Sequence, residues 1–210
     1  CRNHERIGGC SELKMTSKVL IIACGALSLE LNQIKKLNSW DHVTIKCLNA
    51  ELHNTPKLIP EKIEEKYIAL KDDFSKVFIA YADCGTGGML DSLLKEYDLE
   101  RLDGAHCYEF FSGQKRFKEF TDQEIGTLYL TDFLVKHFQR LVVEGLAIDK
   151  YPELKNEYFK HYKKVVYLAQ TRSESLQNDA KKYADFLDLD YSFEYTGLDN
   201  VQSQLNQAVN

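Results

Sequence analysis

The feature that most constrains the fold is the alternation of short apolar runs with longer amphipathic segments. Val19-Leu20-Ile21-Ile22 is a continuous apolar run, which is typical of a strand buried on both faces of a parallel sheet. The next segment, residues 28–36, carries apolar side chains at helical spacing. Because such pairs recur along the chain, we predict an α/β fold with a doubly wound, mostly parallel sheet and helices on both faces.

The pattern assigns an element to most of the chain. Strands are expected at residues 18–23, 43–49, 76–82, 105–110, 164–169 and 190–195. Helices are expected at residues 28–36, from Pro60 onward, and at residues 89–97, 132–144, 153–162 and 173–186. Residues 132–144 have the strongest helical pattern, with Gly145 as the expected stop. It stays open whether their apolar side packs on the sheet or on a second subunit of a homodimer.

Composition limits the domain organisation. With 210 residues, of which 44% are hydrophobic, the chain is long enough for one well-filled domain. We expect this single α/β domain to span residues 15–210, with a helical insertion at about residues 110–162. Residues 1–14 show no periodicity and are expected to be a flexible or non-native extension, which makes Cys1, His4 and Cys10 poor site candidates.

Charge and hydropathy narrow the partners. The net charge of −5, without a long basic run, argues against nucleic acid. No apolar run approaches the roughly 18–20 residues that span a bilayer, and no secretory signal precedes the first strand. We therefore expect a cytoplasmic protein that does not insert in a membrane, takes a small-molecule ligand and keeps its cysteines reduced.

Three cysteines lie at or near the places where predicted strands give way to the next element. Cys24 precedes Gly25, Cys84 precedes Gly85, and Cys107 lies in the run Ala105 to Phe110. Ligands of open α/β sheets bind at the carboxyl ends of the strands, so these thiols are expected at one crevice. The alternative is that they are small buried residues, which is common for cysteine. Cys47 lies on the Val43-Ile45 side of its strand and is expected in the core.

The run Asp83-Cys84-Gly85-Thr86-Gly87-Gly88 is the strongest local motif. A strand, a glycine-rich turn and a helix start direct backbone amides at a ligand and favour a thiolate. The run is neither a Walker A loop nor a dinucleotide fingerprint, because the residues that define them are absent. Gly85, Thr86, Gly87 and Gly88 are therefore candidates for binding an anion or a carboxylate, and the alternative is a tight structural turn.

Histidines add to these strand ends. His53 follows the second strand beside Asn54, and His106 directly precedes Cys107. In a regular strand His106 and Cys107 face opposite sides, so only one would reach the crevice; at a frayed end both would. Glu109 places a carboxylate nearby and joins Cys24 and Cys84 as a catalytic candidate. The turn at residues 170–172 is expected either to contact a substrate or to cap a helix.

Three function classes remain. The first is a metal site of zinc, iron or an iron–sulfur cluster, held by Cys24, Cys84 and Cys107 with His53 or His106. The second is metal-free acid–base catalysis by two cysteines, since the loop from Asp83 resembles the early Asp-Ser-Gly-x-Gly-Gly loop of glutamate and aspartate racemases. The racemases' Asn-Thr and second Cys-Thr-His are absent here. The third class is a non-enzymatic accessory protein that presents a metal or cofactor.

The motifs also resemble an uncharacterised family of prokaryotic proteins, a domain of unknown function. The resemblance covers residues 18–197 and rests on Ala23-Cys24-Gly25-Ala26-Leu27, Leu52-His53-Asn54, Asp83-Cys84-Gly85-Thr86-Gly87-Gly88, His106-Cys107-Tyr108-Glu109, Tyr129-Leu130-Thr131-Asp132-Phe133 and Tyr167-Leu168-Ala169-Gln170-Thr171. Genes of this family often lie beside the genes for corrinoid-dependent methyltransferases and their activators. The resemblance thus implies a link to one-carbon metabolism, with a corrinoid protein or methyltransferase as partner, but assigns no reaction.

Overall fold

The strands form two parallel sheets. The computed structural model describes residues 17–123 and 126–209. The first sheet has the order β2-β1-β3-β4 and contains β1 (Val19–Cys24), β2 (Val43–Leu48), β3 (Lys76–Ala80) and β4 (Glu100–Arg101). The second has the order β5-β6-β7 and contains β5 (Thr127–Thr131), β6 (Lys164–Ala169) and β7 (Asp190–Tyr195). Every pairing is parallel, so the predicted α/β architecture is confirmed, with its strands divided between two sheets.

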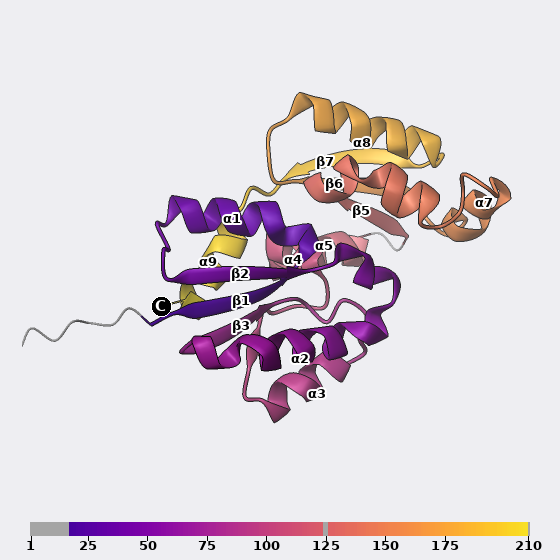
Figure 1. The fold of residues 1–210 in the computed structure, drawn as a ribbon. Helices are drawn as coiled ribbons and strands as arrows, with labels where there is room; N and C mark the ends of the chain where they lie inside the picture. Colours follow the sequence, from indigo (N-terminus) through magenta and orange to yellow (C-terminus); the bar gives the residue numbers. More distant parts are fainter. Residues whose placement is uncertain (1–16, 124–125, 210) are drawn as a thin grey trace, which may run out of the picture.

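Helices cover both sheets (Figure 1). Around the first sheet lie α1 (Ser28–Leu37), α2 (Ile59–Leu70), α3 (Met89–Glu96) and α9 (Asp199–Val209). The remaining helices are α4 (Cys107–Ser112), α5 (Gln114–Gln123), α6 (Asp132–Lys136), α7 (Glu153–Phe159) and α8 (Glu174–Phe186). Figure 1 shows α1 on one face of the first sheet and α2 and α3 on the opposite face.

The apolar runs in the strands are explained by burial on both faces. In β6, Val165 and Tyr167 face a core shared with α6, α7 and α8, whereas Val166 and Leu168 face an aromatic cluster around Phe117. Side chains of a strand alternate between faces, so a strand covered on both sides must be apolar throughout. The same holds for β1, all of whose residues are buried.

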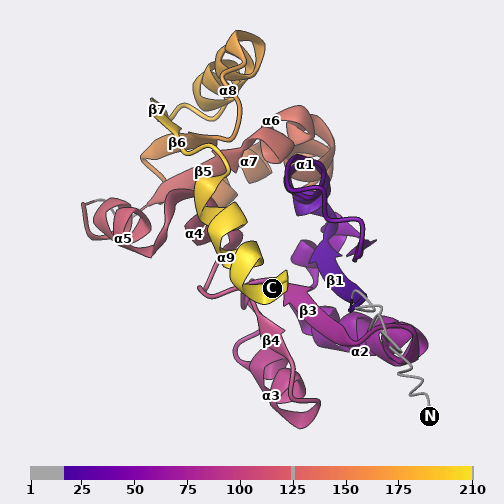
Figure 2. The same ribbon diagram turned by 90° about the vertical axis from the view of Figure 1, so that its left-hand side faces the viewer.

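The helix α9 joins the two halves of the molecule, which are the first half around the sheet β2-β1-β3-β4 and the second half around the sheet β5-β6-β7. After β7 the chain returns to the first sheet, where Val201, Leu205 and Ala208 of α9 are buried in the first core. Figure 2 shows α9 running from the second sheet back toward β3 and β4. The first core is therefore completed by the last residues of the chain.

The prediction of a strand at residues 105–110 is wrong. The strand at this edge is the two-residue β4, and Leu102 continues its pairing by donating from N–H to Ile79 O at 3.1 Å. Gly104 then adopts a φ of +115°, and α4 begins at Cys107. Phe110 and Phe111 of this helix are both buried in the first core.

The segment between residues 110 and 162 also differs from expectation. It contains β5, which the sequence reading placed within a helical insertion. The helix predicted at residues 132–144 is interrupted: α6 ends at Lys136, and a π-helical turn follows at Gln139–Glu144. Gly145 keeps a helical φ of −61° instead of the left-handed stop that was expected. Residues 1–14, the predicted extension, lie outside the described residues.

Within residues 17–123 and 126–209, no helix combines the length and apolar character needed to cross a bilayer.

Candidate functional site: a thiol cluster at a sheet edge

Cys24 ends β1 and turns sharply out of the sheet. Its side chain is 2% exposed, and the N–H of Ala26 donates to Cys24 Sγ at 3.4 Å. Gly25 makes this exit possible, since a Cβ at this position would lie 2.7 Å from Leu48 O at the end of β2. The close approach of the two chains thus holds the thiol at the carboxyl edge of the first sheet, as predicted.

His53 lies beside this thiol. It belongs to a 3₁₀ turn, Ala50–Asn54, that follows β2, and its Nδ1 lies 3.7 Å from Cys24 Sγ and 3.2 Å from Ala50 O. A carbonyl oxygen only accepts, so this contact places the hydrogen on Nδ1 and leaves the lone pair of Nε2 for a ligand. Burial lowers the pKa of His53, which favours the neutral imidazole that metal binding requires.

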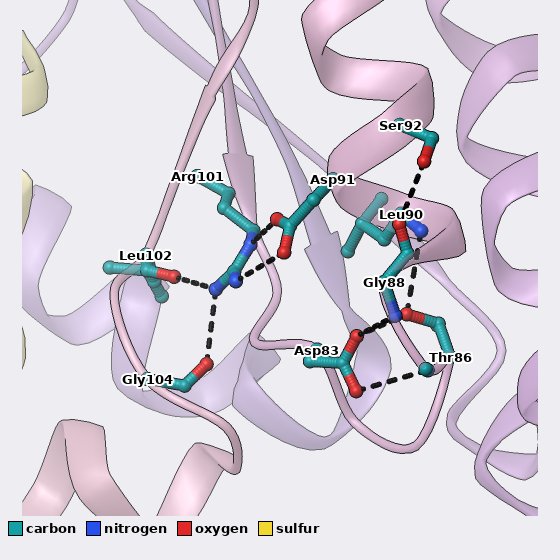
Figure 3. Close-up of polar contacts among 10 residues, drawn as sticks. Asp83, Thr86, Gly88, Leu90, Asp91, Ser92, Arg101, Leu102 and Gly104 are labelled. Carbon is teal, nitrogen blue, oxygen red and sulfur yellow. Dashed lines mark hydrogen bonds and ion pairs between the residues drawn. The ribbon is translucent and has the colours of Figure 1, made fainter.

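Cys84 sits in the glycine-rich loop. Its φ is +49°, and its N–H donates to Ala105 O at 3.0 Å, which ties the loop to the segment leading into α4. Asp83 organises the rest of the loop: its carboxylate accepts from Thr86 Oγ1 at 2.6 Å and from the amides of Gly88 at 2.9 Å and Gly87 at 3.2 Å (Figure 3). The pKa of Asp83 is lowered, chiefly by the hydrogen bond from the Thr86 hydroxyl and further by the backbone amides, while burial opposes the shift.

This carboxylate occupies the amides that the sequence motif offers to a ligand. The anion in the loop is therefore the chain's own Asp83, which matches the tight structural turn left open above. Binding of an external anion by Gly85, Thr86, Gly87 and Gly88 stays a prediction.

Cys107 is the first residue of α4, and Arg101 fixes the chain leading to it. The Arg101 guanidinium donates to the Asp91 carboxylate at 2.6 and 3.2 Å, to Leu102 O at 2.7 Å and to Gly104 O at 3.0 Å (Figure 3). Because the backbone here is a turn and a helix start, the strand alternation expected for positions 106 and 107 does not apply. Cys107 is half-buried and lies against the first core, whereas His106 is exposed.

The three thiols share surroundings that disfavour the thiolate. Burial raises the pKa of Cys24 to about 12 and that of Cys84 to about 11, and it raises the pKa of Cys107 well above its usual value. Cys84 raises the pKa of Cys24 further, and both raise that of Cys107. We call Cys24, Cys84 and Cys107 the thiol cluster. Without a bound cation, its members are neutral thiols at pH 7.

A buried phenol completes the site. The hydroxyl of Tyr81, which follows β3, is buried next to the Cys24 thiol. Burial, followed by the nearby thiol of Cys24, raises its pKa. The phenol therefore adds a neutral polar group to the surroundings of Cys24.

The remaining predicted residues take other places. His106 is exposed at the rim of the site, and Glu109 accepts from the N–H of Ala105 at 3.1 Å and so closes the turn before α4. Cys47 is exposed, so its predicted place in the core is wrong. The reason is that β2 is an edge strand, and only Val43, at its start, is buried.

No group of three or more His, Cys, Asp or Glu side chains in the described part of the chain is arranged to hold a metal ion. The thiol cluster is thus a set of neighbouring donors and not a finished coordination shell.

A second polar centre, which the sequence reading missed, lies at the carboxyl edge of the second sheet. Asp132 is 1% exposed, and its carboxylate accepts from Thr171 Oγ1 at 2.5 Å, Tyr167 OH at 2.6 Å and Gln170 N at 3.0 Å. Ser173, just beyond, caps α8 by accepting from Leu176 N. The turn at residues 170–172 therefore serves the fold, and its order follows from a buried carboxylate at the start of α6.

The fold and the site define a parallel α/β protein with a thiol cluster, two of whose members are buried, at the carboxyl edge of one sheet. The chain belongs to the family described as protein of unknown function (DUF1638), whose model matches residues 47–205. The match includes His53, Cys84 and Cys107 and begins after Cys24. None of the curated proteins and none of the solved structures compared matches the chain.

Proposed function

We propose that the protein binds a soft metal ion, zinc or iron, or an iron–sulfur cluster, through the thiol cluster and His53. The observation that carries the proposal is that Cys24, Cys84 and Cys107 follow the adjacent strands β1, β3 and β4 at one sheet edge. His53 Nδ1 lies 3.7 Å from Cys24 Sγ at the same edge. Three thiolates and one imidazole are a donor set that zinc and iron prefer.

The surroundings of the sulfurs support this choice. The amide of Ala26 donates to Cys24 Sγ, and such hydrogen bonds stabilise thiolates that ligate metals. The Tyr81 hydroxyl lies next to the Cys24 thiol and would donate to that sulfur once it is a thiolate. Metal binding would release the thiol protons, which burial otherwise retains, and would turn the side chains toward one centre. His106, at the rim, is the alternative fourth ligand.

Two other roles are weighed against the metal site. Acid–base catalysis by two cysteines requires one of them as a thiolate at the start of the reaction. Burial opposes this for Cys24 and Cys84, and the charge of Arg101 offsets the effect on Cys84 only in part. An accessory role in corrinoid-dependent methyl transfer rests on the family resemblance, and it uses the same pocket. Co-purification with a corrinoid protein under reducing, anaerobic conditions tests that role.

The decisive experiment is elemental analysis of protein purified without oxygen. We expect about one zinc or iron site per chain, lost from the Cys24→Ser, Cys84→Ser and Cys107→Ser variants. Cys47→Ser is the matched control, because it removes an exposed thiol from the same sheet. Replacement by cobalt should give thiolate-to-cobalt charge-transfer absorption in the wild type and the control. Protein that contains no metal and takes up neither zinc nor iron on reconstitution would refute the proposal.

A further inference from the structure

A cavity of about 270 Å³ lies between the two halves of the molecule, directly beside the thiol cluster. From the first half it is lined by His53, Asn54 and Cys107. From the second half it is lined by side chains of β5, of α6 and of the π-helical turn Gln139–Glu144. Figure 1 shows β5 and α6 above the carboxyl end of the first sheet, so the cavity extends from the proposed metal site toward the second sheet.

The walls of the cavity determine the charge of its ligand. The described residues that line it include no Asp, Glu, Lys or Arg. Most are aliphatic or aromatic; an imidazole and an amide come from His53 and Asn54, and the hydroxyls of the wall belong to Tyr108, Tyr129 and Thr131. Burying an unpaired charge in such surroundings is strongly unfavourable, so the walls select against ions. At the His53 end, a polar group on the ligand would find an imidazole and an amide as partners.

The π-helical turn is the second observation that points to a ligand. It interrupts the helix after α6 and supplies Leu141 and Val142 to the cavity wall. A π-helical turn is rare inside an α-helix, and such turns occur frequently at functional sites. Its exposed residue Gln139 lies on the same turn but outside the cavity.

We propose that this cavity binds a small, uncharged and largely apolar molecule, whose single polar group lies at the end formed by His53 and Cys107. About 150 Å³ suffices for benzene in an apolar protein cavity, so this volume suits one substituted ring or a short alkyl chain. The neutrality and size of the ligand follow from the cavity alone. Only the approach of its polar group to a metal rests on the proposed function.

Calorimetric titration with three probes that share one ring tests the inference. The probes are benzyl alcohol, benzyl mercaptan and benzoate, and the protein is loaded with zinc. We expect benzyl alcohol to bind at least tenfold more tightly than benzoate, because only benzoate carries a charge into the cavity. Leu141→Phe fills the cavity and should weaken benzyl alcohol at least tenfold. Gln139→Phe, which adds the same ring on the solvent side of the turn, should leave binding within about twofold.

Zinc content measured on each variant separates the two proposals. Leu141→Phe protein that retains zinc but loses benzyl alcohol supports the cavity site. A wild type that binds zinc but not benzyl alcohol, or that binds it as tightly after Leu141→Phe, overturns this inference and leaves the metal site intact. Conversely, a preference for benzyl mercaptan that disappears in Cys24→Ser protein supports the metal site. Binding of benzyl alcohol by wild type that takes up no zinc refutes the metal site alone.

Discussion

Replacement of Asp132 by asparagine tests the strongest energetic claim about the second sheet. The carboxylate is 1% exposed and accepts three hydrogen bonds, from Thr171 Oγ1 at 2.5 Å, Tyr167 OH at 2.6 Å and Gln170 N at 3.0 Å. These bonds join the end of β5 to the end of β6. Asparagine has almost the same shape, so the change removes charge and one acceptor without opening a cavity.

The expected loss follows from the number of bonds. A hydrogen bond to a charged group contributes about 1 kcal/mol more than one between neutral groups, which gives about 3 kcal/mol over three bonds. Part of this free energy is regained, because the variant no longer buries the Asp132 charge and no longer repels the carboxylate of Glu30. The repulsion is seen in the pKa of Glu30, which is raised first by burial and also by Asp132. We therefore expect Asp132→Asn to reduce the free energy of unfolding by about 2 kcal/mol.

Urea denaturation at pH 7, followed by far-UV circular dichroism, measures this loss. With a slope of about 2 kcal/mol per M, the midpoint should fall by about 1 M. Asp185→Asn is the matched control, because Asp185 is exposed on α8, and it should change the free energy by less than about 0.5 kcal/mol. A midpoint for Asp132→Asn that equals that of the control would show that the three bonds do not hold the strand ends together.

Three further predictions concern the first sheet. Iodoacetamide should label Cys47 at least tenfold faster than the thiol cluster in native, metal-free protein, because Cys47 is exposed while burial raises the pKa of the others; peptide mass spectrometry with equal rates would contradict this. Asp83→Asn should cost about 1 kcal/mol at pH 7 in thermal unfolding. Folding lowers the pKa of Asp83, so the stability that its carboxylate contributes is present above the ordinary value of 3.8 and is lost as the pH falls through the folded-state pKa. A difference in melting temperature from the wild type that persists unchanged at pH 2 would contradict this role. Gly25→Ala should destabilise by about 1–3 kcal/mol, because its Cβ would lie 2.7 Å from Leu48 O, and it should weaken zinc binding; an unchanged melting temperature would speak against the close approach.

Much of the first half was predictable from local pattern. The buried strands β1 and β3 and the positions of Cys24 and Cys84 follow from apolar runs that end at glycine-rich turns. The helix α8 and its cap at Ser173 were likewise apparent. These features succeed because burial on both faces and turn chemistry leave their signal in neighbouring residues.

The failures share a cause. The segment around Cys107 has β-prone residues but forms a helix start, after Gly104 adopts a φ of +115° and the N–H of Ala105 donates to the Glu109 carboxylate. Cys47 alternates like a core residue, yet it is exposed, because β2 is an edge strand in which only Val43 is buried. Local pattern reports which side a residue faces and not whether anything covers that side.

The sequence by itself determined that this chain is a parallel α/β protein with reactive residue types at strand ends, since periodicity and glycine turns are local properties. Only the tertiary structure decided which of them meet. It brought His53 to Cys24 and placed Cys107 beside them, and it gave the amides of the glycine-rich loop to Asp83. The cavity between the two sheets also exists only in three dimensions. These outcomes depend on packing between segments far apart in the chain, and such packing leaves no periodic trace in the sequence.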